Sequence, residues 1–529
     1  MQGISRSVGT CVLIGYVALF SAPSHAAAPE RQAVLDAMKR ATAFMTGQVS
    51  YRGGYLWNYL PDFSRRWGEM EAYETMIWLQ PPGTSSMGHV FLDAYHATGD
   101  EDYYEAARQV AAALVWGQHP SGGWNYLVDF AGERSLEQWY ATIGRNAWRL
   151  EEFQHYYGNA TFDDQVTTDA AKFLLRLYVE KLDPRYKAPL DKAIQFVLDS
   201  QYPVGGWPQR YPLKYEYSRP GHPDYTSYLT FNDDVAAENI SFLILCYRVL
   251  GDRQLLDSIT RGMNFFVLTQ QSPEQPGWSL QYTLDLHPAA ARTYEPRALA
   301  THTTASNIDH LISYFGLTGE SRFLARVPEA IDWLDARRLA GGSTDRGATH
   351  PTFIESDTDK PLYVHRRGSN VVNGEYYADY DSRNILGHYS AFRRIDIDGL
   401  RKRYEEARSA SPQDIADSSP LMPDKGAADL PRFFADAYAP VEPQNPGTQA
   451  ADVVSRLNST GYWPAPLPQT SHPYRGDGSR ESVRGDFSGT DVGDESDTSP
   501  FTADTPAVGI STAEYLRNMN VLIHWLARQ

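Results

Sequence analysis

Apolar residues recur three and four positions apart over most of the first 400 residues of this 529-residue chain, which is the spacing of amphipathic helices. In one example, the apolar positions of segments 173–178 and 193–197 lie on either side of a Leu-Asp-Pro turn at 182–184. Turns of similar composition lie at 98–100, 250–252 and 318–320. The pattern therefore predicts pairs of helices joined by short turns.

A second kind of turn, in which glycine precedes an aromatic residue, recurs four times in the same region. These turns occupy residues 53–55, 122–124, 205–207 and 276–278. Helix pairs repeated in this way commonly close into a ring whose connecting loops line one mouth. We therefore predict an all-α fold, an (α/α) toroid built from repeated helix pairs over residues 30–400.

The pattern changes after about residue 400. Segment 409–458 is broken by Pro, Asp and Ala, and segment 470–505 is rich in Gly, Ser and Asp with little periodicity. Helical spacing returns over residues 512–526. We expect residues 401–529 to form a loop-rich C-terminal extension that ends in a helix packed on the toroid. A small separate domain is the alternative.

The first 28 residues have the features of a secretory signal peptide. Arg6 precedes an apolar stretch at 8–20, and small residues at 24–28 suit cleavage. The stretch is too short to span a membrane, and no second one follows. We therefore expect a secreted or periplasmic protein with no membrane span. Cys11 leaves with the signal, and Cys246 is expected to be a buried core thiol.

Charge and composition exclude some partners. The chain has 48 Lys and Arg against 65 Asp and Glu, and this net charge of −17 disfavours nucleic acid as a partner. An anionic polymer stays open, because the local potential in a cleft can differ from the global sum. Aromatic residues at 13% suit a sugar-binding cleft as well as a large core. We expect the protein to be a monomer.

Two pairs of adjacent acidic residues mark the candidate site. Asp163 and Asp164 precede one predicted helix, and Asp233 and Asp234 precede another. One aspartate at such a position ordinarily caps the helix, but each site has two. Because equivalent loops of a toroid meet at one mouth, the four acids can bind a hard cation such as Ca²⁺ or divide the acid and base roles of glycoside hydrolysis. Sequence spacing leaves these alternatives open.

Longer motifs around these acids resemble a known family. Residues 201–212 (Gln-Tyr-Pro-Val-Gly-Gly-Trp-Pro-Gln-Arg-Tyr-Pro), followed by 230–234 (Thr-Phe-Asn-Asp-Asp), closely resemble polysaccharide lyase family ten, the α/α-toroid pectate lyases. The similarity extends upstream to 161–164 and downstream to 288–295, and it covers about residues 160–400. The resemblance implies a pectate lyase that cleaves an acidic polysaccharide, polygalacturonate or a related polyuronate, by Ca²⁺-assisted β-elimination.

The resemblance also implies roles for individual residues. Arg292 matches the family's catalytic arginine, the proposed base at C5 of the sugar. Asp163 and Asp233, with Asp164 and Asp234 beside them, match the positions of the calcium and substrate site. An isolated guanidinium stays protonated at ordinary pH, so the base role of Arg292 rests on the resemblance alone.

Further residues are expected to bind the substrate. Arg366 matches an arginine that contacts a uronate carboxylate, and Arg367 beside it can supply another. Tyr294 is the alternative base if Arg292 only stabilises charge. The other expected substrate contacts are Trp207, Gln209 and Gln281. For the tryptophan, packing between helices is the alternative to stacking on a sugar.

The chain also departs from the family pattern. Residues 279–283 (Ser-Leu-Gln-Tyr-Thr) stand in place of Cys-Ala-Gln-His-Asp, and Thr352 occupies a position where an arginine is expected. His365 and Arg367 replace the glycine and the aspartate that flank the downstream arginine. We expect the fold and the elimination chemistry to survive these changes, while the preferred uronic acid polymer stays open.

Two other functions compete with a lyase. The first is a toroid glycoside hydrolase that acts on unsaturated uronides, with two of the four aspartates as acid and base. The second is a non-catalytic glycan-binding protein that kept the fold and lost the site. Thr352 and the changed segment 279–283 are the features that keep this second alternative open.

Overall fold

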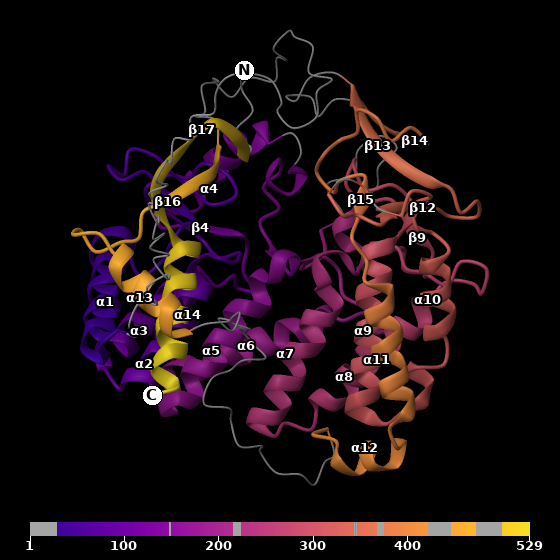
Figure 1. The fold of residues 1–529 in the computed structure, drawn as a ribbon, viewed down its shortest axis with the longest axis horizontal. Coiled ribbons are helices and arrows are strands. Elements are labelled where there is room, and N and C mark those ends of the chain that lie inside the picture. Colours follow the sequence, from indigo (N-terminus) through magenta and orange to yellow (C-terminus); the bar gives the residue numbers. More distant parts are fainter. Residues whose placement is uncertain are drawn as a thin grey trace, which may run out of the picture.

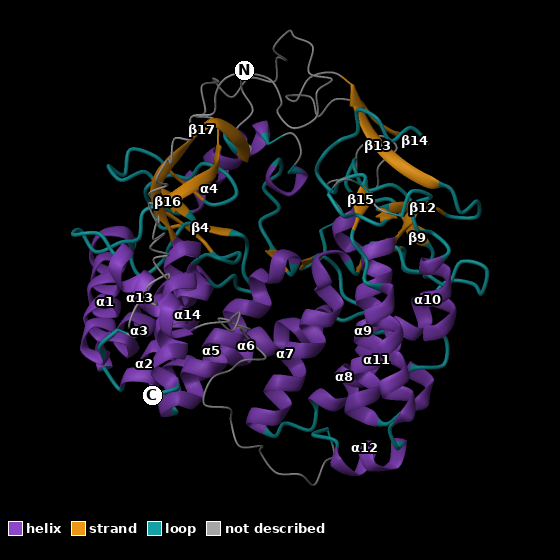
Figure 2. Ribbon diagram, viewed as in Figure 1, coloured by secondary structure: helices purple, strands orange, loops and turns teal. Residues whose placement is uncertain are grey.

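The computed structural model describes most of the chain, but the predicted signal peptide and parts of the predicted C-terminal extension lie outside the described residues. The described residues are 29–147, 150–214, 224–342, 344, 346–367, 375–421, 446–471 and 500–529. Helices dominate this part of the chain. Figure 2 shows the helices gathered on one side of the molecule and the short strands and loops on the other.

Most of the helices form pairs that stand side by side in an arc (Figure 1). In each pair the two helices pack on each other. The pairs are α2 (Thr84–Thr98) with α3 (Glu101–Gly117), α5 (Val166–Lys181) with α6 (Pro184–Ser200), α7 (Val235–Leu250) with α8 (Leu255–Thr269), and α9 (Thr301–Thr318) with α10 (Val327–Asp335). Helix α5 packs on both α2 and α7, so the first members of three pairs form a continuous inner row, and α9 packs on α8. The predicted α/α toroid is therefore confirmed.

The C-terminal end of the chain joins the same arc. Helix α13 (Pro446–Arg456) pairs with α14 (Thr512–Ala527), and α14 packs on α2 at the start of the inner row. Helix α1 (Arg31–Phe44) lies against α13 and α14, and the hydroxyls of Thr42 and Tyr515 are 2.6 Å apart. The remaining helices are α4 (Glu133–Ala141) among the loops, and α11 (Ile397–Ser409) and α12 (Pro412–Ser418), which pack on α9.

The repeated glycine–aromatic turns lie between the second helix of a pair and the strand that follows it in the chain. Gly122 and Gly205 have φ values of +112° and +102°, which favour glycine, and an added Cβ would meet a backbone oxygen at 2.2 Å or less. The tryptophan two residues later donates its indole N–H to a carbonyl near the end of the preceding helix. These bonds are Trp124 to Leu114, Trp207 to Val197, Trp278 to Phe266 and Trp463 to Val453.

Short antiparallel strands connect the helices, and the helical periodicity did not predict them. Among the described residues they form six small sheets. Three sheets have two strands each: β3 (Met76–Trp78) with β4 (Leu127–Asp129), β5 (Ala160–Thr161) with β6 (Arg210–Tyr211), and β11 (His350–Pro351) with β15 (Phe392–Arg393). One sheet has three strands, in the order β7 (Leu229–Thr230), β8 (Gln281–Tyr282) and β9 (Pro288–Ala289). Two sheets have four strands, in the orders β10 (Ala298–Ala300), β12 (Phe353–Glu355), β13 (Pro361–Arg367), β14 (Glu375–Asp379), and β16 (Ala465–Ser471), β17 (Pro500–Ser511), β1 (Asn58–Tyr59), β2 (Arg66–Trp67). Most are too short for an alternating pattern to appear in the sequence.

These strands place chemically equivalent loops together. Strand β5 leads into α5, β7 leads into α7 and β10 leads into α9, so three inner helices begin at the same end of the arc. The acidic motifs lie at two of these junctions. Among the described residues, no helix is long and apolar enough to cross a bilayer.

Candidate active site

The two acidic motifs form the same kind of turn. After β5, residues Asp163–Gln165 make a single 3₁₀ turn before α5, and after β7, residues Asn232–Asp234 do the same before α7. The two turns lie against each other. Asp164 and Asp233 have positive φ values of 47° and 52°, a conformation that aspartate adopts more readily than most residues. By position in the turn, Asp164 therefore corresponds to Asp233, and Asp163 corresponds to Asn232.

Helix capping does not explain these acids. The residues that precede α5 and α7, Gln165 and Asp234, make no side-chain capping hydrogen bond. Asp164 instead accepts a hydrogen bond of 2.6 Å from Gln80, and Asp233 accepts one of 2.5 Å from Asn232. Carboxylates at strained, uncapped turns are typical of functional sites.

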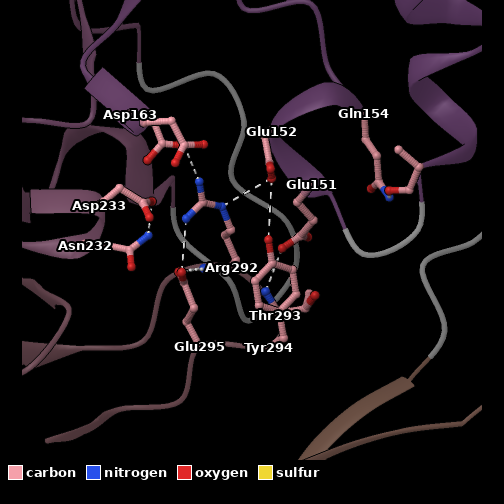
Figure 3. Close-up of polar contacts among 12 residues, drawn as sticks. Glu151, Glu152, Gln154, Asp163, Asn232, Asp233, Arg292, Thr293, Tyr294 and Glu295 are labelled. Atoms are coloured by element: carbon pink, nitrogen blue, oxygen red, sulfur yellow. Dashed lines mark hydrogen bonds and ion pairs between the residues drawn. The ribbon is translucent and has the colours of Figure 1, made fainter. Parts of the chain in front are cut away.

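Arg292 is buried at the centre of an acidic cluster (Figure 3). Its Nη2 donates to Asp163 Oδ2 at 2.6 Å, and its Nη1 donates to Glu295 Oε1 at 3.0 Å. Its Nε lies 3.3 Å from Glu152 Oε2. The side chains of all four residues are no more than 7% exposed. One guanidinium thus bridges three carboxylates that come from three separate segments of the chain.

Two neighbouring glutamates hold the loop that carries Arg292. The 3₁₀ turn Glu151–Phe153 places the Glu151 carboxylate 2.6 Å from the Thr293 amide, which donates to it. The Tyr294 hydroxyl donates to Glu152 over 3.4 Å. Figure 3 shows both glutamates on the same side of the arginine loop. Neither glutamate was predicted from the sequence, because no motif relates Arg292 to residues about 140 positions upstream of it.

The charge balance keeps Arg292 protonated. Burial alone would lower its pKa, but Asp163 and Glu295 together with other acidic neighbours hold the pKa well above its usual value. Burial likewise opposes ionisation of Asp163, yet Arg292 and hydrogen bonds to its carboxylate bring the pKa of Asp163 below the usual value. Tyr126 is one of these donors. Arg292 and Asp163 therefore form an ion pair in the protein interior.

Four acidic residues in and around the cluster hold their protons more tightly than usual. Burial, together with the charges of Asp163 and other neighbouring acids, raises the pKa of Asp164 and of Asp233 well above the usual value. Burial raises the pKa of Glu152 to about 7 despite Arg292, and it raises the pKa of Glu69, beside Glu152, to about 8. The cluster therefore contains more acidic groups than its single guanidinium neutralises.

The oxygen-rich cluster suits a hard cation in its chemistry, because Ca²⁺ prefers carboxylate and carbonyl oxygens. Asp163 and Asp233 lie on adjacent turns, whereas Asp164 is hydrogen-bonded to Gln80. Asp234 turns towards α9, where Ser306 donates to it at 3.2 Å and His310 lies 3.8 Å away. Within the described ranges, no three His, Cys, Asp or Glu side chains are arranged to bind a metal ion.

The predicted substrate residues occupy different positions around the cluster. Gln281 donates to Glu295 over 3.5 Å, and Gln209 is buried beside Asp163. Tyr294 is buried, with its ring against Tyr389. The expectation that Trp207 binds substrate is not supported, since its ring is fully buried and its N–H is bonded to a helix carbonyl.

The downstream basic residues lie on β13. Arg366 is buried and pairs in register with Tyr376 of β14. The side chain of Arg367 lies outside what the structure describes. At the departure from the family pattern, the Thr352 hydroxyl donates to the carbonyl of Ser390 at 2.7 Å. Thr352 thus joins two backbone segments.

Comparison with known proteins identifies the family. The sequence model of the pectic acid lyase family matches residues 129–402, more than half of the chain. No curated protein sequence matches. Among solved structures, a family 10 polysaccharide lyase from Cellvibrio cellulosa is 18% identical and aligns over 63% of this chain and 95% of its own with a TM-score of 0.38. A mutant of that lyase in complex with trigalacturonic acid is 17% identical and aligns over 63% of this chain and 97% of its own, with a TM-score of 0.39.

The cellobiose 2-epimerase from Bacillus thermoamylovorans is 11% identical, with 94% of this chain and 100% of the epimerase aligned and a TM-score of 0.41. The match to the family spans the acidic turns, the Arg292 loop and strand β13. It confirms the resemblance that the motifs around residues 201–234 predicted. The chain belongs to the pectic acid lyase family, and the protein is a polysaccharide lyase.

Proposed function

We propose that the protein cleaves polygalacturonate, or a closely related polyuronate, by calcium-assisted β-elimination. The observation that carries this proposal is the buried ion pair of Arg292 with Asp163, which Glu152 and Glu295 complete inside the region matched to the family. A guanidinium fixed among carboxylates is suited to neutralise negative charge in a site that excludes water.

In the proposed reaction the C5–H bond breaks and its electron pair forms the C4=C5 double bond. The C4–O4 bond breaks at the same time or afterwards, and the leaving O4 takes up a proton from water or from the group that removed the C5 proton. The difficult step is removal of a proton next to a carboxylate, because negative charge then develops on that carboxylate. A positive group placed there lowers the barrier, and each tenfold gain in rate corresponds to about 1.4 kcal/mol.

We assign this charge-stabilising role to Arg292. Its three carboxylate neighbours keep it protonated, so the role as a base that the family resemblance implied is less favoured than charge stabilisation. A proton acceptor is available nearby. Glu152 has a pKa raised to about 7 by burial, which suits proton transfer at neutral pH, and it contacts both Arg292 and Tyr294.

Calcium would be held by the aspartates of the two turns. Asp163 and Asp233 supply hard oxygen ligands on adjacent segments, and Asp234 is 52% exposed at the edge of the cluster. When bound, the ion would supply positive charge next to a uronate carboxylate. The excess of acidic groups over cations supports this proposal, since a divalent cation would balance it.

We also propose that the protein acts outside the cytoplasm, as a secreted or periplasmic enzyme. The support is the signal-like sequence of residues 1–28, which lies outside the described residues. A polymer substrate would be accessible there.

The experiment that tests the proposed function is a substrate panel assayed with added calcium and with a chelator. We expect polygalacturonate, and not a neutral polysaccharide, to yield a product with the ultraviolet absorbance of an unsaturated uronide. Chelation should abolish the signal and added Ca²⁺ should restore it. Cleavage that is indifferent to chelation would remove calcium from the proposal, and failure on every polyuronate would overturn the substrate class.

A further inference from the structure

A second guanidinium, that of Arg393, lies near the acidic cluster and has no carboxylate partner within the part of the chain that the structure describes. Arg393 ends β15, which pairs with β11, and its carbonyl accepts a hydrogen bond of 2.8 Å from the Thr349 amide. Its side chain is partly buried, and its Nε is buried without a hydrogen bond among the described residues. Over the same residues its guanidinium forms no ion pair within 4.0 Å.

Contacts connect Arg393 to the Arg292 cluster. Its Cζ lies 6.0 Å from the centre of the Tyr389 ring. The Tyr389 hydroxyl donates to Glu295 Oε1 at 2.6 Å, and the same oxygen accepts from Arg292 Nη1 at 3.0 Å. Only one tyrosine ring and one carboxylate therefore separate the two guanidinium groups.

The electrostatics of the two arginines differ. Burial lowers the pKa of Arg393, and the nearby Tyr389 and Asp233 offset this only in part. The pKa of Arg292 is raised instead, because three carboxylates contact it. His302 experiences the charge of Arg393: burial and that charge lower the pKa of His302 to about 3. His302 is therefore neutral at ordinary pH and does not compete for an anion.

A partly buried guanidinium without an ion-pair partner is stabilised when an anion binds it. The planar fork of arginine matches the two oxygens of a carboxylate. In the proposed function the substrate presents one carboxylate on each sugar, and Arg292 is assigned to the sugar that reacts. Arg393, which has no carboxylate partner among the described residues, is available to the carboxylate of another sugar of the polymer.

We propose that Arg393 binds a uronate carboxylate of the polysaccharide beside the Arg292 cluster, an assignment that rests on the proposed function. Arg393 would act in substrate recognition and distinguish a free uronate from its methyl ester. An ester is neutral, so it gains less from a guanidinium than a carboxylate does.

The test compares Arg393→Gln with Arg394→Gln, a matched change at the exposed neighbouring arginine. Binding of an oligogalacturonate and of its methyl ester is measured by calorimetry on the full chain, together with KM and kcat on polygalacturonate. For Arg393→Gln we expect a loss of about tenfold or more in affinity for the acid, little change for the ester, and an effect mainly on KM. Arg394→Gln should behave as the wild type, and Arg393→Lys should recover part of the loss.

An unchanged preference for the acid in Arg393→Gln would overturn the assignment. Equal losses for acid and ester would also overturn it, because they would indicate a structural role. If Arg393→Gln does not fold, Arg393→Lys decides: a partial loss of affinity for the acid with unchanged affinity for the ester supports the assignment. Unchanged affinity for both ligands, or equal losses for both, at a normal Tm overturns it. A wild type that neither binds nor cleaves any uronate would instead contradict the proposed function.

Discussion

The two ends of the helix pairs use aspartate in different ways. At the end opposite the site, Asp100 and Asp183 precede α3 and α6, and each accepts a hydrogen bond of 3.0 Å from the backbone amide two residues later. At the site end, Asp233 has a positive φ, and Asp163 directly precedes Asp164, which also has one. The residues that precede α5 and α7 there make no capping hydrogen bond with their side chains. The same residue type therefore stabilises a helix at one end and forms a charged cluster at the other.

The difference follows from burial and neighbouring charge. Asp183 is partly exposed, and hydrogen bonds from Arg185 lower its pKa to about 2. Asp233 faces Asp163 and Asp164, and burial with those charges raises its pKa well above the usual value. Within the site, the pKa of Asp163 is lowered while that of Asp233 is raised, and pKa values pushed apart in this way are typical of active sites. The site end thus gathers acidic groups that helix capping does not require.

The largest effect is expected from Arg292→Lys. The substitution keeps a positive charge but loses the planar fork that contacts three carboxylates. We expect kcat to fall by about a hundredfold or more with little change in KM. The matched change at the opposite end, Arg185→Lys, should leave turnover intact. Full turnover by Arg292→Lys would contradict the proposed role.

Asp233→Asn should have the next largest effect. The amide replaces a carboxyl group whose raised pKa already favours the neutral form, so the Tm should change little. Activity and its calcium dependence should fall together, by about tenfold or more, because the amide cannot lose a proton to become the charged oxygen ligand that Ca²⁺ would bind. Titration of activity with Ca²⁺ alongside thermal melting measures both. A lower Tm with unchanged activity would assign Asp233 to the structural class of Asp183.

The stability of the chelated protein should depend on pH through the raised acids. Glu152 and Glu69 ordinarily have pKa values of 4.5, and in the fold they rise to about 7 and about 8. The folded state therefore binds more protons than the unfolded state between these values, and this stabilisation is lost as the pH rises. We expect the Tm to fall between about pH 5 and pH 8, and Glu69→Gln to weaken the fall. A Tm that rises over this range would contradict the conclusion that the cluster holds more acidic groups than its guanidinium neutralises.

Asp183→Ala should have the smallest effect, confined to stability. Loss of the cap on α6 should cost about 1 kcal/mol of unfolding free energy. Turnover on the same preparation should match the wild type, because the residue lies at the other end of the helix pair. A loss of turnover at unchanged Tm would show that the two ends are not functionally distinct.

Much of this architecture could be predicted from the sequence, because its signals are local. The three-and-four spacing predicted helices such as α5 and α6, and the 288–295 motif selected Arg292. The partners of Arg292 were harder to find. Glu152 approaches Arg292, and Tyr389 approaches its partner Glu295, only through tertiary folding, and no spacing in the sequence relates them.

Other predictions failed or stayed open for physical reasons. Trp207 follows a Gly-Gly turn, a pattern compatible with both packing and sugar binding, and only its burial against Val197 distinguishes them. The short strands were missed because two or three residues show no period. Calcium stays a proposal, as does the role of Arg366 in binding substrate.

The most direct test of the account is the ratio of two products formed by the wild type on polygalacturonate in the presence of Ca²⁺. Elimination gives one unsaturated end, detected by its ultraviolet absorbance, for every new reducing end, whereas hydrolysis gives reducing ends without unsaturation. If the enzyme acts by elimination, both signals should appear in equal molar amounts and Arg292→Lys should lower them together. Reducing ends that accumulate without the unsaturated product would contradict this mechanism.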